Sequence, residues 1–269
     1  MAKPFLKWAG GKRWFVHHFE HLLPVEFDRY IEPFLGGGAV FFHLAPKRAV
    51  LGDANADLIN TYSALQKNWR LVYRYLKEHH ANHSPHYYYQ IREKQLQSSF
   101  TRAAQFIYLN RTCWNGLYRV NLQGSFNVPI GTKSSVVFED DRFDLVSEKL
   151  QSATLVVADF EDLIDAAGDG DFVFVDPPYT VRHNHNAFIK YNEKLFSWFD
   201  QLRLFQALKR AKSRGALILG TNAYHQSVRN LYENDFDTMC VSRNSPISSK
   251  ASTRSKFEEL VILTERVDG

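Results

Sequence analysis

The chain has very little cysteine. Cys113 and Cys240 are the only two in 269 residues, whereas small secreted domains stabilised by disulfides carry many more for their length. We therefore expect two free, buried thiols rather than a disulfide. The cysteines and histidines also lack the spacing of a zinc site, so no metal ion is expected.

Long apolar runs and targeting signals are missing as well. No apolar stretch approaches the ~20 residues that a helix needs to cross a bilayer. The first residues, Met1-Ala2-Lys3-Pro4, lack the apolar core of a signal peptide. Together with a hydrophobic content of 45% and a charged content of 23%, these absences indicate a globular, cytoplasmic protein.

Basic residues are concentrated in the middle of the chain, although the net charge is only +4. Residues 57–138 hold ten Lys/Arg and three Asp/Glu, a net charge of +7, so the remainder carries −3. A basic segment inside a mildly acidic remainder suggests an insertion that binds a polyanion. The alternative is a solvated helical surface. Histidines 79, 80, 83 and 86 lie in this segment, and we expect them on a solvent- or polyanion-facing side of a helix.

The first part of the chain predicts an α/β fold. A helix is expected over 12–22, a short strand over 28–32, a helix over 39–43 and a strand over 48–52. With the glycine-rich loop before the second helix, this order is typical of the nucleotide-binding half of a doubly wound sheet. Later elements continue the sheet. They are strands over 155–158, 172–175, 216–219 and 259–263, with a helix over 194–213.

Between these parts the pattern becomes helical and rich in aromatic residues. The expected helices are 58–80, 87–97 and 101–112. Polar and apolar residues then alternate over 116–128 around Gln123-Gly124, which is typical of a β-hairpin. The sequence thus predicts one α/β domain, residues 1–56 and 139–269, interrupted by a mainly helical insertion, residues 57–138.

The strongest motif is Asp176-Pro177-Pro178-Tyr179, which follows the apolar run 172–175. Prolines lack an N–H and have a fixed φ, so they hold the Asp176 carboxylate and the Pro177 carbonyl rigid at the end of a buried parallel strand. These two acceptors can bind both hydrogens of an exocyclic amino group, while Tyr179 offers a flat face for stacking a base. An amino group held in this way has its lone pair aimed in one direction, as methyl transfer to a base nitrogen requires.

Two glycine-containing segments are candidates for ligand binding. The loop Glu32-Pro33-Phe34-Leu35-Gly36-Gly37-Gly38 lacks the spacing of a dinucleotide fingerprint, but its glycines let the backbone approach a ligand closely. Asp53 ends the next strand, where an acid can hold ribose hydroxyls or cap a helix. The segment Lys7-Trp8-Ala9-Gly10-Gly11-Lys12 can cradle an anion such as a carboxylate. Each segment alone is equally compatible with an ordinary turn.

Taken in order, these motifs resemble those of the Dam-type DNA adenine-N6 methyltransferases, the alpha group of the D12 class. The resemblance covers about residues 5–264 and includes Leu109-Asn110-Arg111, Asn115-Gly116-Leu117 and Gly124-x-Phe126-Asn127-Val128-Pro129-x-Gly131. It implies a doubly wound, Rossmann-like sheet of the S-adenosylmethionine-dependent methyltransferases. The helical insertion and hairpin would then be the target-recognition domain.

The resemblance implies S-adenosylmethionine as the methyl donor. Trp8 and Lys12 would contact its methionine part, Asp53 its ribose, and Asp176 would lie where donor and target meet. Asp159 could flank the adenine of the donor or cap a helix. The implied cofactor-binding residues are Trp8, Lys12, Phe34, Gly36, Gly38, Asp53, Asp159, Phe160 and Asp176, and the implied catalytic residues are Asp176, Pro177, Pro178 and Tyr179.

The resemblance also implies that the hairpin reads double-stranded DNA. Trp114 stands where well-known members have a tyrosine that wedges into the base stack, the alternative being a core tryptophan. Arg119 would contact a guanine, and Leu117 and Pro129 a thymine methyl. Lys133 replaces an aromatic of GATC-specific members, which leaves room for another target. The implied DNA-binding residues are Lys7, Arg92, Arg111, Trp114, Asn115, Leu117, Arg119, Asn121, Asn127, Pro129 and Lys133, with Lys7 near the first base pair and with Arg111, Asn121 and Asn127 as phosphate or positioning contacts.

The expected reaction is direct methyl transfer to N6 of an adenine flipped out of duplex DNA, with GATC as the expected target. No covalent intermediate is expected, because neither cysteine lies in a Pro-Cys motif. Two alternatives stay open: an RNA adenine methyltransferase, and a DNA-binding relative without catalysis. We expect a bacterial or phage-encoded protein that acts on DNA as a monomer or weak dimer. An orphan enzyme, a phage product and a restriction-modification partner are equally compatible with the motifs.

Overall fold

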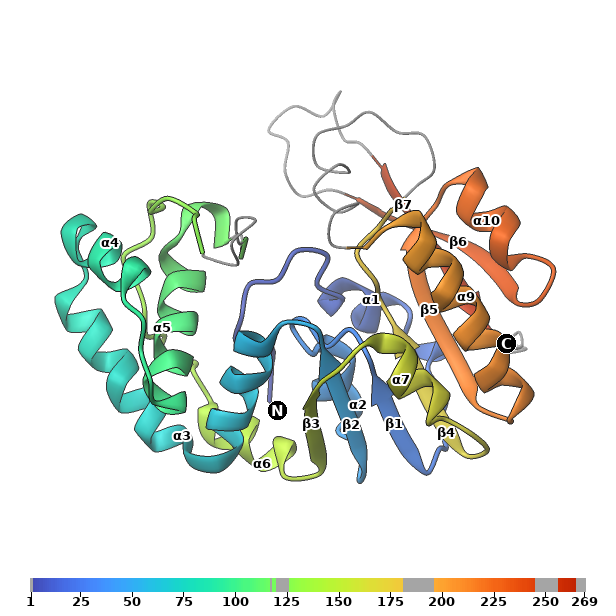
Figure 1. Ribbon diagram of the computed structural model, residues 1–269, viewed down its shortest axis with the longest axis horizontal. Helices are drawn as coiled ribbons and strands as arrows, with labels where there is room; N and C mark the ends of the chain where they lie inside the picture. Colours follow the sequence, from blue (N-terminus) through green and yellow to red (C-terminus); the bar gives the residue numbers. More distant parts are fainter. Residues whose placement is uncertain (1, 117, 120–125, 181–195, 245–255, 265–269) are drawn as a thin grey trace. The chain divides into compact units, whose positions relative to one another are not determined.

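Figure 1 shows the computed structural model of the chain, which describes residues 2–116, 118–119, 126–180, 196–244 and 256–264. In this described part, seven strands form a mixed, mostly parallel sheet, whose order is β3 (Ala153–Val157), β2 (Ala49–Asp53), β1 (Arg29–Glu32), β4 (Asp171–Val175), β5 (Leu217–Ala223), β7 (Lys256–Leu263) and β6 (Asp237–Asn244). Helices and strands alternate along the chain at both ends. The predicted α/β class, with its largely parallel sheet, is confirmed, and the arrangement is consistent with a Rossmann-like methyltransferase.

The chain divides into two compact units, residues 1–18 with 35–158, and residues 19–34 with 159–269. The helices of the expected insertion belong to the first unit, together with β2 and β3. The expected domain boundaries, 57–138 inside 1–56 and 139–269, differ from those of the units and stay a prediction. Of the helices that the structure describes, none has both the length and the apolarity of a membrane span.

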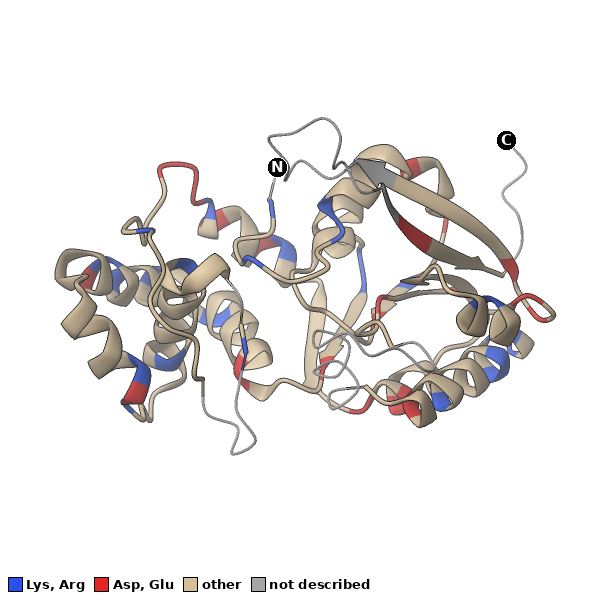
Figure 2. Ribbon diagram, turned by 90° about the horizontal axis from the view of Figure 1, so that it is seen from above, with Lys and Arg blue, Asp and Glu red and all other residues tan. Residues whose placement is uncertain are grey.

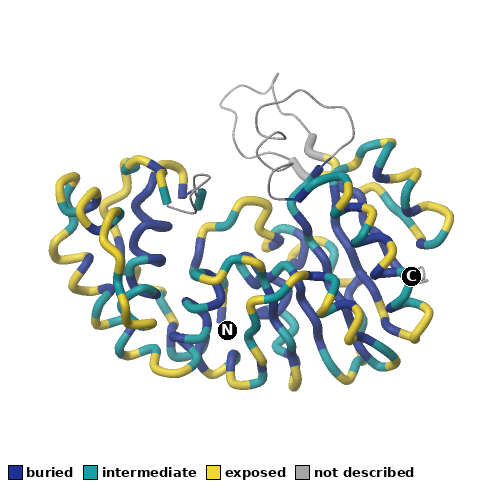
Figure 3. Tube along the Cα trace, in the orientation of Figure 1, coloured by how far each residue is buried: buried dark blue, intermediate teal, exposed yellow. Residues whose placement is uncertain are grey.

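In the first unit, two parallel strands and several helices surround a common core. β2 (Ala49–Asp53) pairs with β3 (Ala153–Val157) so that Asp53 lies beside Val157. α3 (Ala56–Asn82) packs against α5 (Ser99–Thr112) and α6 (Phe143–Leu150), and two short helices, α1 (Arg13–His18) and α2 (Ala39–Leu44), complete the unit. The inward faces of α3 and α5 are buried (Figure 3). The largest fully buried side chains in this unit include Tyr62, Tyr88 and Tyr108.

Capping residues explain where the helices of this unit begin. The Asn55 side chain accepts hydrogen bonds from the first turn of α3, and the Ser84 side chain does the same for α4 (Pro85–Glu93). Pro85 stands at the first helical position, where its missing N–H costs nothing. The three helices expected over 58–80, 87–97 and 101–112 are therefore present, although α4 begins two residues earlier than expected and ends at Glu93.

The hairpin expected over 116–128 is described only at its base. After a 3-10 turn at Trp114–Gly116, the Trp114 N–H donates to the Pro129 carbonyl at 2.9 Å, and the Asn127 N–H donates to the Arg119 carbonyl at 3.4 Å. These bonds join the two sides of the segment in antiparallel fashion. Leu117 and residues 120–125, which include Asn121, lie outside the described residues.

The second unit contains the remaining strands. β1 (Arg29–Glu32), β4 (Asp171–Val175) and β5 (Leu217–Ala223) are parallel, while β7 (Lys256–Leu263) runs antiparallel to β5 and to β6 (Asp237–Asn244). All five residues of β4 are buried, as its apolar run predicts.

Helices of the second unit accompany these strands. They are a short 3-10 turn (Glu20–Leu22), α7 (Phe160–Asp165), α9 (Trp198–Ser213) and α10 (Gln226–Tyr232). α9 begins four residues later than expected, because Ser197 and Asp200 form a capping box there.

Both cysteines are free, as expected. Cys113 is buried at the end of α5, but Cys240 is exposed on β6, so the expectation of burial is wrong for Cys240. His79 differs from expectation too. It is buried and stacks on Tyr108 with ring centroids 4.9 Å apart, and its Nδ1 lies 2.8 Å from the Tyr87 hydroxyl. Burial lowers the pKa of His79 to about 4, so its imidazole is neutral at physiological pH.

Candidate active site and nucleic-acid interface

Asp176 follows β4 directly, at the carboxyl end of a parallel strand. The register pairs Val175 of β4 with Gly220 of β5, so the next residues, Asp176 and Thr221, lie side by side. The Thr221 hydroxyl donates to Oδ1 of Asp176 at 2.8 Å, and Thr221 is fully buried. The strand pairing thus supplies a hydrogen bond that fixes the orientation of the Asp176 carboxylate.

Tyr179 is held by a buried carboxylate from outside the motif. Its hydroxyl donates to Oε2 of Glu259, on β7, at 2.7 Å. Burial raises the pKa of Tyr179 well above its usual range, and the negative charges of Asp176 and Glu259 raise it further. The phenol therefore stays protonated and remains a hydrogen-bond donor. Pro177 is buried and Pro178 half-buried between these two anchored side chains.

The glycine loop is shaped by its contact with Trp8. Gly36 has a φ of +46°, and a Cβ at this position would lie 2.7 Å from Cδ1 of the Trp8 indole. Only glycine fits here, because a side chain would both strain the backbone and overlap the ring. The carbonyl of Gly36 accepts a hydrogen bond from the buried Tyr62 hydroxyl at 3.0 Å. Gly38, with a φ of +63°, then begins α2.

Asp53 connects this loop to the following helix. Its carboxylate accepts the backbone N–H of Gly36 at 3.1 Å and that of Asn55 at 2.9 Å. Burial raises the pKa of Asp53 to about 6, although these two N–H donors oppose the shift. The N-cap of α3 is Asn55, so the alternative role of Asp53 as the helix cap is wrong.

The N-terminal motif is built into the first unit by hydrogen bonds and stacking. Lys12 is buried, and its Nζ donates to the Gly10 carbonyl at 2.9 Å. The Trp8 indole stacks on Tyr118, with ring centroids 5.7 Å apart and an interplanar angle of 19°. Tyr118 lies beside Arg119 at the hairpin base. Trp8 therefore contacts both the glycine loop and the segment that is expected to read DNA.

Asp159 caps a helix, as one of its two expected roles required. Its Oδ1 accepts the Glu161 N–H at the start of α7 and also binds Arg203 at 2.8 Å. Phe160 stacks on Phe34, with ring centroids 5.3 Å apart. The two phenylalanines expected near the cofactor are thus brought together in the second unit.

Residues expected to contact DNA line the hairpin base in the first unit. Trp114 is 54% exposed, which contradicts the alternative of a core tryptophan. Nε of Arg119 donates to Oδ1 of Asn127 at 3.3 Å, which orients its guanidinium. Nη1 of Arg92 reaches the Val128 carbonyl at 3.5 Å. Four further expected contacts are exposed: Lys7, Asn115, Asn127 and Pro129.

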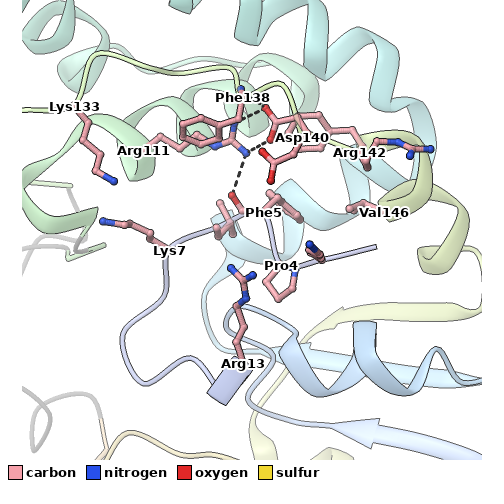
Figure 4. A pocket seen from close by; sticks show the side chains of 14 residues that line it. Pro4, Phe5, Lys7, Arg13, Arg111, Lys133, Phe138, Asp140, Arg142 and Val146 are labelled. Carbon is pink, nitrogen blue, oxygen red and sulfur yellow. Dashed lines mark hydrogen bonds and ion pairs between the residues drawn. The ribbon is translucent and has the colours of Figure 1, made fainter. Parts of the chain in front are cut away.

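Lys7 and Lys133 form a pair of like charges. The backbone of Lys7 is fixed by Asn110, whose side chain accepts the Lys7 N–H at 2.9 Å and donates to the Lys7 carbonyl at 2.8 Å. The side chains of Lys7 and Lys133 point toward one another (Figure 4). Partial burial and the charge of Lys133 lower the pKa of Lys7. The pair lies at a pocket of about 420 Å³ in the first unit, which Lys3 and Arg13 also line.

Arg111 has a different environment from the other expected DNA contacts. It is 4% exposed, and its guanidinium forms two hydrogen bonds of 2.7 Å with Asp141. It also donates to the carbonyls of Val136 and Phe5, and it stacks on Phe138 (Figure 4). These contacts give Arg111 a structural role inside the first unit, and its expected contact with DNA stays a prediction. Arg111 ties the N-terminal segment and the loop before α6 to the end of α5.

Three residues at these sites carry roles that the sequence does not reveal: Thr221, Glu259 and Tyr118. Thr221 and Glu259 reach the motif only through strand register. Tyr118 looks like an ordinary hairpin residue, and only its stack on Trp8 sets it apart. Among the described residues, no group of three or more His, Cys, Asp or Glu is arranged to hold a metal ion.

Comparisons with known proteins identify the family of the chain. A family model described as the D12 class N6 adenine-specific DNA methyltransferase matches residues 8–247. The chain is 35% identical to the type II methyltransferase M1.LlaDCHI of Lactococcus lactis subsp. cremoris, over 97% of this chain and 94% of that one. It is 34% identical to the DNA adenine methylase of Vibrio cholerae serotype O1 and 32% identical to that of Escherichia coli K12, in each case over 97% of this chain and 95% of the relative.

Proposed function

Because the chain belongs to the D12 class of N6 adenine-specific DNA methyltransferases, we propose that it transfers a methyl group from S-adenosylmethionine to an adenine flipped out of duplex DNA, within GATC. One observation carries the proposal. At the end of β4, Asp176 and Tyr179 are each anchored by a buried side chain, Thr221 for the first and Glu259 for the second. A base stacked in a duplex does not reach such a motif, so the adenine must be extruded.

The motif residues account for activation of the adenine amino group. The Asp176 carboxylate and the Pro177 carbonyl accept its two hydrogens, and the Tyr179 ring stacks on the base. With both hydrogens engaged, the N6 lone pair is turned out of conjugation with the ring. As N6 becomes positively charged, its hydrogen bond to Asp176 strengthens, so the carboxylate stabilises the transition state more than the ground state. The same carboxylate can then accept the proton that N6 loses.

Residues of the first unit fit the binding of S-adenosylmethionine. Gly36 has no side chain and lies against Trp8, which suits a ligand that packs against backbone. Asp53 is ionised above about pH 6, so its carboxylate can accept hydrogen bonds from ribose hydroxyls. The Lys12 ammonium suits the carboxylate of the methionine part. When bound, the donor supplies a sulfonium methyl, which needs no covalent enzyme intermediate. The remaining proposed contacts are Gly38 of the first unit and Phe34, Asp159, Phe160 and Asp176 of the second.

We propose that the hairpin base reads the DNA. Exposure of Trp114 supports its role as a wedge in the base stack, and the orientation of Arg119 by Asn127 supports bidentate contact with a guanine. Lys7 and Lys133, which form no ion pair with a carboxylate of the described residues, suit acceptors on a base edge or a phosphate. GATC as the target rests on the resemblance of Leu117, Arg119 and Pro129 to the reading residues of GATC-specific members.

Expression of the chain in a methylation-free host, followed by single-molecule sequencing of the host DNA, tests the proposal. The expected result is N6-methyladenine at GATC. Methylation confined to a motif without GATC would overturn the target and leave the chemistry intact. If the purified, folded protein also transfers no methyl group to any duplex DNA, the proposed function is wrong.

A further inference from the structure

Glu259 is a buried carboxylate outside the Asp-Pro-Pro-Tyr motif. It is 5% exposed and lies on β7, opposite Ala223 of β5 in the strand register. Because β7 runs antiparallel to β5, its first half lies at the edge of the sheet where β4 and β5 end. This is why a residue 80 positions away in the sequence reaches the Tyr179 hydroxyl, at 2.7 Å.

The bond between these two groups restrains the Tyr179 ring. Burying a carboxylate is costly unless it is hydrogen-bonded, and a phenol that donates to a carboxylate forms a charge-assisted bond, which is stronger than a neutral one. A phenolic O–H prefers the plane of its ring, so the acceptor position restricts both side-chain torsions of Tyr179. The ring is thereby held at two ends, by its Cα and by its hydroxyl.

We propose that Glu259 is a positioning residue for methyl transfer: by binding the Tyr179 hydroxyl, it fixes the ring plane on which the target adenine stacks. The inference rests on the proposed function, since it concerns the step in which the flipped base is held. A misplaced ring would leave N6 displaced from the Asp176 carboxylate. Misplacement of a reacting atom by about 1 Å can cost 10²-fold in rate.

Three substitutions test this hydrogen bond, of which Tyr179→Phe also removes the interaction of the Tyr179 hydroxyl with Thr221. Glu259→Ala removes the acceptor, Tyr179→Phe removes the donor but keeps the ring, and Glu259→Gln keeps an oxygen that can accept the same bond. Tyr232→Phe is the matched control. Tyr232 is a fully buried tyrosine of the same unit whose hydroxyl accepts a hydrogen bond from Gln201 at 2.7 Å, and neither residue belongs to the motif.

The measurements are steady-state methylation of a GATC duplex and the fluorescence of 2-aminopurine placed at the target adenine. We expect Glu259→Ala and Tyr179→Phe to lower kcat by about 10- to 100-fold, with KM for DNA changed less than about threefold. Glu259→Gln should stay within about fivefold of wild type, and Tyr232→Phe should match wild type in kcat. Stacking on tyrosine quenches a flipped 2-aminopurine, so its emission should rise in Glu259→Ala and return toward the wild-type level in Glu259→Gln.

The losses of kcat in Tyr179→Phe and Glu259→Ala should also be non-additive. If they act through one bond, the double variant should be no slower than the slower single variant, because the bond can be lost only once. Multiplied losses would overturn the inference.

Other outcomes overturn the inference as well. Wild-type kcat in Glu259→Ala would do so, as would equal losses in Glu259→Gln and Glu259→Ala, because glutamine can still accept the bond. An equal loss in Tyr232→Phe would mean that any buried phenol of this unit matters. If Glu259→Ala does not fold, Tyr179→Phe tests the same bond, and wild-type kcat in that variant refutes the role. If the wild-type protein itself does not methylate adenine, the proposed function is wrong, and this result is distinct from any loss seen only in the variants.

Discussion

Basic side chains are used in opposite ways at two places in this protein, on α9 of the second unit and at the hairpin base of the first. In the second unit, Arg203 and Arg210 of α9 bind the carboxylates of Asp159, Glu161 and Asp165 at 2.7 to 2.9 Å. Figure 2 shows where Lys and Arg (blue) and Asp and Glu (red) lie along the ribbon. At the hairpin base of the first unit, Lys7 and Lys133 face each other, and no described carboxylate forms an ion pair with either. The comparison shows that pairing, rather than the number of basic residues, distinguishes a surface available to a polyanion.

The same distinction applies inside the basic segment 57–138. Arg92 binds Glu93, Arg102 binds Asp57 and Arg111 binds Asp141, so three of its ten cations are paired with carboxylates within the first unit. Asp57 and Glu93 are already subtracted in the net charge of +7, but Asp141 lies outside the segment, so its pairing with Arg111 lowers the charge available to DNA by one more. Substitutions of paired and unpaired charges should have different consequences, and these can be ranked by size.

The largest effect, on the rate of methylation, is expected for Asp176, whose carboxylate is fixed by a hydrogen bond and is proposed to bind the substrate. Asp176 is bound by Thr221, and in the proposed reaction its carboxylate also binds the adenine amino group. Loss of positioning and of transition-state stabilisation together should lower methylation in Asp176→Ala by about 10⁴-fold, whereas Asp176→Asn keeps one acceptor and should lose about 10²-fold. Methylation rates on a duplex substrate, with thermal unfolding as a folding control, measure this. Turnover of the alanine variant near that of wild type would refute the catalytic role.

The second effect is structural and concerns a paired, buried charge. Arg111→Ala leaves the Asp141 carboxylate buried without its guanidinium, which should lower the free energy of unfolding by about 3–5 kcal/mol. Urea denaturation measures it. The substitution should change stability and not the contacts with DNA, so the protein that stays folded should bind DNA with the salt dependence of wild type. A stable variant with a weaker salt dependence would mean that Arg111 contacts phosphate after all.

The third effect concerns the recognition of the DNA sequence by Arg119. Arg119→Ala should relax discrimination at one guanine–cytosine pair, because a bidentate arginine contributes about 1–3 kcal/mol of discrimination. Methylation rates on the cognate duplex and on duplexes substituted at single base pairs measure the change. If every duplex slows equally and discrimination is unchanged, Arg119 is a backbone contact.

The fourth effect concerns the unpaired lysines. Lys133→Ala should weaken binding to DNA, and if Lys133 contacts a phosphate, the slope of log K against log salt should fall by about 0.9. Binding measured at several salt concentrations gives the slope. An unchanged slope with altered sequence preference would instead assign Lys133 to a base edge.

The sequence predicts more of the fold than of the candidate site. Uninterrupted apolar runs and long amphipathic stretches reveal β4 and α3, but β6 escapes prediction, because only Val241 is buried among its residues of described burial. The Asp-Pro-Pro-Tyr motif is contiguous and therefore visible in the sequence. Thr221 and Glu259 reach it through the register of β5 and β7, which hydrophobic patterning does not fix. Charge counting likewise cannot show that Arg111 is bound by an aspartate 30 residues later.

The smallest effect is expected where a charge is paired at the surface, and it completes the comparison. Arg210 is as basic as Lys133 but binds Asp165 through two nitrogens, at 2.9 and 2.8 Å, and Glu161 at 2.7 Å. Exposed ion pairs contribute about 0–1 kcal/mol, so Arg210→Ala should lower the free energy of unfolding by no more than that. Because its charge is already neutralised, the salt dependence of DNA binding should stay that of wild type. Both variants should be measured in the same buffers. If Arg210→Ala also lowers the slope, pairing with carboxylates does not keep a cation from contributing to DNA binding, and the distinction between α9 and the hairpin base fails.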